Sequence, residues 1–249
     1  MSRTMSDTNK PNILFIITDQ HRADHLSCYG HPVIKTPNID SLAARGRLFE
    51  KFYVASAVCQ PNRSTLMTGR MPSLHGVRHN GIPLDRRANT FVDLMRVQGY
   101  RTALVGKSHL MNMTSTEPFF GKPQPSVEKT PVPKEFELAV PVDHEDPYYD
   151  QEHPQKWHEK SSFEVKLPFF GFEHVDLQTG HADGVGGDYL RWLEKRIPNS
   201  KSLKGPENAL PHHYTAAQAW RTAIPEDLYP TSYITHKSIE YLEKHAANG

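Results

Sequence analysis

The chain has 249 residues, of which 37% are hydrophobic, enough to bury a core in one large or two small domains. Its net charge of +1 argues against nucleic acid or an anionic membrane surface as the main partner. It contains no run of about 18 apolar residues, so we expect no transmembrane helix.

The two cysteines, Cys28 and Cys59, are too few to indicate a disulfide framework. Residues 1–10 are polar and predicted to be disordered, and they lack the apolar segment of a secretory signal. We therefore expect a cytoplasmic protein. A periplasmic location stays open, because a removed signal peptide would leave no trace in the sequence.

The first predicted element is a continuous apolar run of strand length at residues 12–18. Such runs are typical of a parallel strand that is buried on both faces. The run ends at Asp19 and Gln20, and ligands gather at the carboxyl ends of strands in open α/β sheets. Asp19 is thus a candidate metal ligand, with a loop or capping role as the alternative.

Helix and strand signals then alternate along the chain. Asn38 is a predicted N-cap and Gly46 a helix stop, and Thr90 and Gly99 bracket a second helix in the same way. This alternation of strands with helices predicts an α/β architecture. The predicted strands are residues 12–18, 48–54, 100–105 and 169–175, and the predicted helices are residues 38–45, 59–68, 91–98, 189–195 and a last helix from 225 onward.

The stretch from Cys59 to Gly69 has the pattern C-x-P-x-R followed by an apolar turn and Thr-Gly. Pro61 suits a first helical turn and Gly69 suits the residue after a helix end. Cys59 would then lie where free backbone N–H groups and the positive end of the helix dipole favour an anion. Arg63, one turn further on, could hold that anion. Taken alone, this arrangement also fits a thiolate nucleophile.

Two segments interrupt the regular pattern, at about residues 111–166 and 199–224. Structureless segments of this length in a compact domain are usually functional or mobile. We interpret them as insertions over the active-site face that help to select the substrate. A solvated excursion without such a role is the alternative.

Four segments together resemble the type I, formylglycine-dependent sulfatases, in the order that this family shows. The resemblance covers roughly residues 11–110. It implies the α/β fold of the alkaline-phosphatase-like superfamily, with a large, mixed, mostly parallel central sheet flanked by helices. Residues 11–249 would then be the N-terminal part of the catalytic domain. The four segments are residues 11–30 with Thr-Asp-Gln, 36–43 with Thr-Pro-Asn, 59–70 with Cys-Gln-Pro-Asn-Arg, and 106–110 with Gly-Lys-Ser-His-Leu.

The resemblance also implies a metal site and a modified residue. Asp19, Gln20 and Cys59 would hold a divalent metal, with Ca²⁺ expected and Mn²⁺ or Mg²⁺ open. Gln20 stands where many members have a second Asp. The resemblance here is to the bacterial branch that includes phosphonate monoester and phosphodiester hydrolases, in which the analogous Asp-Gln pair is found. Cys59 would be oxidised to formylglycine by a formylglycine-generating enzyme or an equivalent maturation system.

The remaining matched positions would act on the substrate, a small anionic ester. Arg63 would stabilise the aldehyde hydrate, Lys107 would bind the anionic ester oxygens, and His109 would be the base. Asn80 resembles a substrate-contacting Asn of the phosphonate-hydrolase branch. The non-catalytic alternatives are a buried thiol for Cys59 and solvated or turn-forming roles for the other side chains.

Hydrolysis of sulfate esters is the function that this resemblance predicts. The alternatives are a phosphonate monoester or phosphodiester hydrolase with the same machinery, and an inactive sulfatase-like binding module. The family's leaving-group acid and its remaining metal ligands have no counterpart in these 249 residues, so we expect the isolated chain not to turn over substrate. A homo-oligomer stays open.

Overall fold

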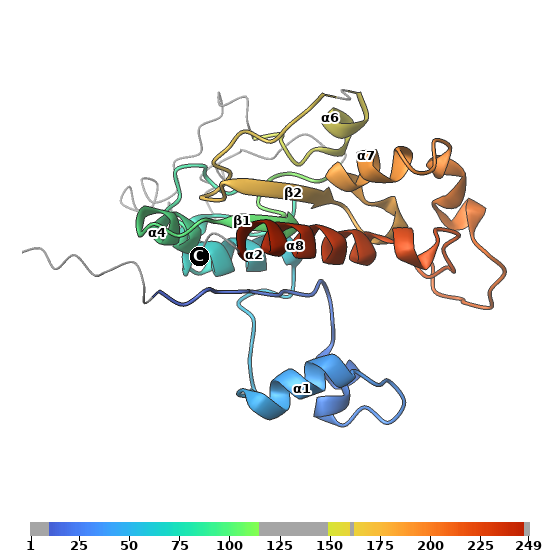
Figure 1. Ribbon diagram of the computed structural model, residues 1–249, viewed down its shortest axis with the longest axis horizontal. Coiled ribbons are helices and arrows are strands. Elements are labelled where there is room, and N and C mark those ends of the chain that lie inside the picture. Colours follow the sequence, from blue (N-terminus) through green and yellow to red (C-terminus); the bar gives the residue numbers. More distant parts are fainter. Residues whose placement is uncertain (1–9, 115–148, 160–161, 247–249) are drawn as a thin grey trace, which may run out of the picture. The chain divides into compact units, whose positions relative to one another are not determined.

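The computed structural model describes residues 10–114, 149–159 and 162–246 (Figure 1). Almost all of the predicted disordered start and most of the insertion predicted at residues 111–166 lie outside these ranges. The chain divides into two compact units, Met1–Tyr53 and Val54–Gly249. Among the described residues, no helix is long and apolar enough to cross a membrane.

The first unit contains the helix α1 (Pro37–Arg45) and the short 3₁₀ helices η2 (Ala23–His25) and η3 (Ser27–Tyr29). The helix begins with a proline at its first position, after Thr36, and not at the predicted N-cap Asn38. Asp40 binds η3 to α1, because its carboxylate accepts hydrogen bonds from the Ser27 hydroxyl at 2.5 Å and the Cys28 amide at 2.9 Å. These hydrogen bonds, first that from Ser27, lower the pKa of Asp40.

The strands predicted at residues 12–18 and 48–54 are not formed, so both predictions are wrong for this structure. Ile13, Leu14 and Ile16 are 59%, 69% and 71% exposed, where two-sided burial was expected. The physical reason is that a strand needs a neighbour for its backbone hydrogen bonds. The described part of this unit contains helices and irregular chain only, and supplies no such neighbour.

The second unit carries the sheet, with strand order β1-β2-β3. β1 (Ala103–Gly106) runs parallel to β2 (His174–Thr179), with Ala103 opposite His174, and β2 pairs antiparallel with β3 (Gly186–Gly187). The α/β class and the mixed sheet are confirmed, but the described sheet has three strands. The strand predicted at residues 100–105 is found at Ala103–Gly106, so it begins three residues later than predicted. The strand predicted at residues 169–175 begins only at His174.

Each strand of this sheet has at least one helix of the second unit packed against it. The predicted cap of α4 is confirmed as a capping box: Thr90 accepts a hydrogen bond from the Asp93 amide, and the Asp93 side chain accepts one from Thr90. The last predicted helix is divided, because the 3₁₀ turn η7 (Glu226–Leu228) precedes its α-helical part. The helices are α2 (Cys59–Thr68), α3 (Pro72–His75), α4 (Phe91–Val97), α6 (Pro154–Glu159), α7 (Asp188–Glu194) and α8 (Pro230–Ala246), and short 3₁₀ turns η4 (Ala182–Gly184), η5 (Ser200–Leu203) and η6 (Pro206–Asn208) lie between them.

Two apolar clusters form the core of the second unit. The first joins α2 and α4 to the loops around Leu84 and Leu110, and Val77, Leu84 and Met111 in it are fully buried. The second joins α7 to α8 through Tyr189, Leu193 and Tyr233. α8 also packs against β1, beside which it runs in Figure 1. The first cluster therefore anchors the same loops that carry the candidate site residues.

The junction between β3 and α7 admits no side chain. Gly187 has a φ of 75°, and a Cβ atom there would lie 2.3 Å from the Leu177 carbonyl oxygen. The next residue, Asp188, accepts a hydrogen bond from the Leu177 amide at 2.7 Å. Burial raises the pKa of Asp188 to about 6 from its ordinary 3.8, although this hydrogen bond and Arg191 act in the opposite direction.

The raised pKa of Asp188 predicts a stability that falls as pH rises. Between about pH 4 and pH 6 the native state keeps a proton that the unfolded state has lost, so the free energy of unfolding decreases with pH across this window. Asp188→Asn keeps an acceptor for the Leu177 amide and removes the titration. Urea unfolding of both proteins across the window should show a shallower pH dependence for the variant. Parallel curves would contradict this assignment.

Candidate active site

The site in the second unit begins at the first residue of α2, Cys59. Val58 is the N-cap residue and provides no side-chain cap, and Gly69 ends the helix with a φ of 66°. The predicted helix and both of its ends are therefore confirmed. Cys59 is half-buried and stands at the helix end where first-turn N–H groups lack helical acceptors.

Asn80 lies against the start of α2. Its side-chain oxygen accepts a hydrogen bond from the Gln60 amide at 3.2 Å and from the Cys59 thiol, whose Sγ is 3.6 Å away. Asn80 thus acts as the cap that Val58 does not supply. The structure brings together Cys59 and Asn80, two of the predicted site residues, across 21 positions of sequence.

Gln60 fastens the loop that carries Asn80. Its side-chain oxygen accepts from the Gly81 amide and its side-chain nitrogen donates to the Ile82 carbonyl oxygen, both at 2.7 Å. The Gln60 side chain is fully buried. Sequence reasoning assigned it no role, because a Gln in a motif gives no signal of which distant backbone groups its amide will meet.

Arg63 joins α2 to the carboxyl end of β1. Its guanidinium donates to the Lys107 carbonyl oxygen at 2.7 Å, and the Arg63 side chain is only 7% exposed. Lys107 is the first residue after β1, as predicted. The Arg63 side chain is therefore bonded to the backbone of the other predicted cation, Lys107.

The Lys107 ammonium contacts a histidine that the sequence did not single out. Its Nζ lies 3.3 Å from His181 Nε2 and 3.4 Å from His181 Nδ1. His181 immediately precedes η4 (Ala182–Gly184). The Gly-rich stretch around it does not have the spacing of a nucleotide-binding motif, so the sequence provided no reason to assign His181 a function.

His109 occupies an unusual backbone conformation. It is 3% exposed and has a φ of 51°, in the left-handed region that costs a non-glycine residue about 1–3 kcal/mol. Gln20 also has a φ of 51°. Such residues are uncommon and cluster at functional sites, so two predicted site residues share a feature that is independent of the sequence motifs.

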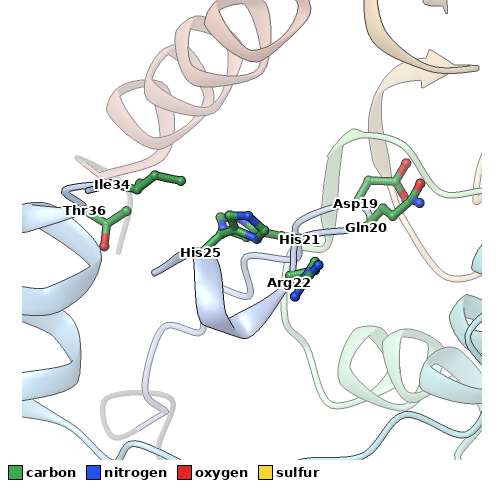
Figure 2. Close-up of a pocket in the computed structure, with 7 residues that line it drawn as sticks. All are labelled: Asp19, Gln20, His21, Arg22, His25, Ile34 and Thr36. Atoms are coloured by element: carbon green, nitrogen blue, oxygen red, sulfur yellow. The ribbon is translucent and has the colours of Figure 1, made fainter. Parts of the chain in front are cut away.

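Asp19 and Gln20, the other predicted metal ligands, belong to the first unit. They line one end of a cavity of about 440 Å³, with His21, Arg22 and His25 beside them and Ile34 and Thr36 at the other end (Figure 2). A carboxylate and an amide oxygen are the donors that Ca²⁺, Mg²⁺ and Mn²⁺ prefer. The pair fits part of such a site, and the described residues contain no group of three His, Cys, Asp or Glu side chains that could hold a metal.

A sequence model of the sulfatase family matches residues 11–165 of the chain, which is more than half of its length. The chain belongs to the sulfatase family. It is similar to the N-acetylglucosamine-6-O-sulfatase of Bacteroides thetaiotaomicron, with 37% identity over 106 residues that cover 43% of the chain and 19% of that protein. It is also similar to arylsulfatase A of Bos taurus, with 40% identity over 114 residues that cover 43% of the chain and 22% of that protein. The matched segment spans about a fifth of the length of these relatives.

One solved structure extends this sulfatase-family likeness over nearly the whole chain. The crystal structure of the phosphonate monoester hydrolase of Agrobacterium radiobacter is 28% identical with a TM-score of 0.62, and the match covers 94% of this chain and 38% of that one. The predicted alkaline-phosphatase-like α/β fold and its partial extent are thereby confirmed. The likeness includes the region after residue 165, which the family model does not reach.

Removing the Gln60 amide should destabilise the loop that carries Asn80. In Gln60→Ala, the buried Gly81 amide and Ile82 carbonyl lose their partners, at a cost of about 1–3 kcal/mol each. We expect a free energy of unfolding lower by several kcal/mol in urea titrations. The matched control is Gln155→Ala on the exposed side of α6, which should stay within about 0.5 kcal/mol of the wild type. Equal losses in both variants would contradict the role given to Gln60.

Proposed function

We propose that the protein hydrolyses sulfate esters as a sulfuric ester hydrolase. One observation carries this proposal: Cys59 at the start of α2 is joined to Asn80, while Arg63 on the same helix is bonded to Lys107. Two residues of α2 that the family resemblance selected are thus each bonded to a selected residue from a distant stretch of the second unit. The sulfatases among the curated relatives support the same reaction class.

The two cations account for recognition of an anionic ester. The Lys107 ammonium would bind the ester oxygens, and His181 beside it restricts where that ammonium can lie. Arg63 is fixed through the Lys107 carbonyl, so its charge needs little reorganisation as negative charge develops. Fixed charges of this kind usually contribute more to such catalysis than any other single effect.

A modified Cys59 and a metal would complete the chemistry. Formylglycine at position 59 would supply a hydrated aldehyde as nucleophile, and it implies a maturation enzyme as partner. A divalent metal held by Asp19 and Gln20 would supply Lewis-acid chemistry, and Ca²⁺ is our first choice. Asn80, which accepts a hydrogen bond from the Cys59 thiol, would orient the nucleophilic position, and His109 would be the base that accepts a proton at an imidazole nitrogen.

A second candidate function rests on one specific observation. The match that covers 94% of the chain is to a phosphonate monoester hydrolase, and Gln20 replaces the second Asp seen in many sulfatases. A neutral amide lowers the negative charge at the metal. The same residues could therefore act on a phosphonate monoester or a phosphodiester, and we propose this as the alternative. The cytoplasmic location stays a prediction from the polar N-terminal residues.

Replacing Cys59 should abolish the activity, and the other cysteine provides the control. The complete protein would be produced in a host that makes formylglycine, and the Cys59 peptide would be examined by mass spectrometry. We expect an aldehyde in place of the thiol, activity in Cys28→Ser and none above background in Cys59→Ser. An unmodified thiol together with an inactive wild type would favour the inactive binding module.

The substrate class would be decided by parallel assays on the same preparation. Aryl sulfate, phosphonate monoester and phosphodiester substrates would be compared by kcat/KM, and we expect the highest value for the sulfate. Lys107→Ala should lower kcat/KM by about 100-fold or more, because one fixed charge is lost. Lys195→Ala, an exposed lysine just after α7, is the control. A higher kcat/KM for the phosphonate would establish the alternative in place of sulfate ester hydrolysis.

A further inference from the structure

The segment after β1 is held by a buried carboxylate from a distant part of the chain. Glu152 is fully buried, and its side chain accepts four hydrogen bonds. Oε1 accepts from the Ser108 hydroxyl at 2.5 Å and the His109 amide at 2.8 Å. Oε2 accepts from the Leu110 amide at 2.7 Å and the Met111 amide at 2.6 Å.

These bonds replace the secondary structure that the segment lacks. β1 ends at Gly106, so the amides of residues 109–111 have no strand ladder to join. Three consecutive buried amides without acceptors would each cost about 1–3 kcal/mol. Glu152 provides one acceptor oxygen or the other to each of them, and it thereby fixes the left-handed conformation of His109.

Glu152 is itself anchored to the loop that carries Asn80. The neighbouring Tyr149 hydroxyl accepts from the Arg86 amide at 3.1 Å and donates to Asp85 at 3.5 Å. The Leu84 amide donates to the Leu110 carbonyl oxygen at 2.7 Å, which closes the connection. The Asn80 loop and the Lys107–His109 segment are therefore fixed relative to each other through residues 149–152.

The hydrogen bonds favour the ionised form of Glu152. Three of the four partners are backbone amides, which can only donate, whereas the Ser108 hydroxyl can donate or accept. Burial acts against this form and raises the pKa of Glu152, while the hydrogen bonds lower it. Burying a charged carboxylate is costly, so the segment at residues 108–111 needs this side chain for its conformation.

We propose that Glu152 is a positioning residue of the active site, which holds Lys107 and His109 in their working geometry by binding the peptide groups between and after them. This inference rests on the proposed ester hydrolysis. Glu152 acts through the Ser108 hydroxyl and the backbone amides of residues 109–111, and it is not itself assigned a contact with a reacting atom. It lies in the stretch interpreted from the sequence as an insertion that selects substrate, and gives that stretch a structural function.

The isosteric variant Glu152→Gln tests this role. Its side-chain NH₂ would face amide donors, so one half of the four-bond arrangement becomes repulsive. In the complete protein we expect kcat to fall about 10- to 100-fold with KM changed much less, because misplaced catalytic groups lose rate before binding. Amide hydrogen exchange in a peptide spanning residues 107–112 should become faster. Glu152→Asp, which keeps the charge, should recover part of both losses, and Glu159→Gln at the exposed end of α6 should match the wild type.

If Glu152→Gln does not fold, a milder variant can test the same role. Ser108→Ala removes one of the four bonds and leaves the amides in place, so we expect a folded variant with a slightly lower unfolding midpoint and a fall of kcat of about 3- to 10-fold. Normal kinetics in folded variants, or lost activity with unchanged exchange, would overturn the proposal. An inactive wild type would reject the proposed function alone, while faster exchange in the variant would still support Glu152 as the holder of this segment.

Discussion

The hydrogen bond from the Arg63 guanidinium to the Lys107 carbonyl oxygen connects the two elements on which the second unit's candidate site is built. It joins the first turns of α2 to the carboxyl end of β1 across 44 residues of sequence. Arg63 is almost completely buried, so its planar donor fork needs acceptors with fixed positions. Apart from this direct contact, α2 reaches the segment after β1 by a longer route, through the Gln60–Ile82 hydrogen bond and the hydrogen bond from the Leu84 amide to the Leu110 carbonyl oxygen.

The other connections follow the same principle, in which a polar side chain satisfies distant backbone groups. The buried side chains of Gln60 and Glu152 hold residues 81–82 and 109–111, and the exposed Asn80 caps α2. Each loop carries a candidate functional side chain, and each is held by hydrogen bonds from a side chain that is distant in the sequence. Loops carry function when a rigid scaffold positions them. In this protein the scaffold for the loops is a small set of side-chain amides and carboxylates, more than the three-stranded sheet itself.

Local signals were sufficient for part of this structure. The helix stop at Gly69, the cap at Thr90 and the strand end before Lys107 depend on neighbouring residues, and the sequence predicts all three. Glu152 and His181 could not be found in this way, because their contacts join residues that are 44 and 74 positions apart. The apolar run at residues 12–18 was predicted as a strand because its composition suits one, but strand formation depends on a neighbour that composition cannot supply.

That apolar run has a consequence for the behaviour of the chain in solution. Ile13 to Ile17 form five consecutive large hydrophobic residues, each at least 41% exposed, without a charge or a proline among them. Segments with high β-propensity and no charge pair readily with copies of themselves when they are open to solvent. A preparation of these 249 residues would therefore be prone to concentration-dependent self-association through this stretch, so light scattering belongs beside any kinetic measurement made on it.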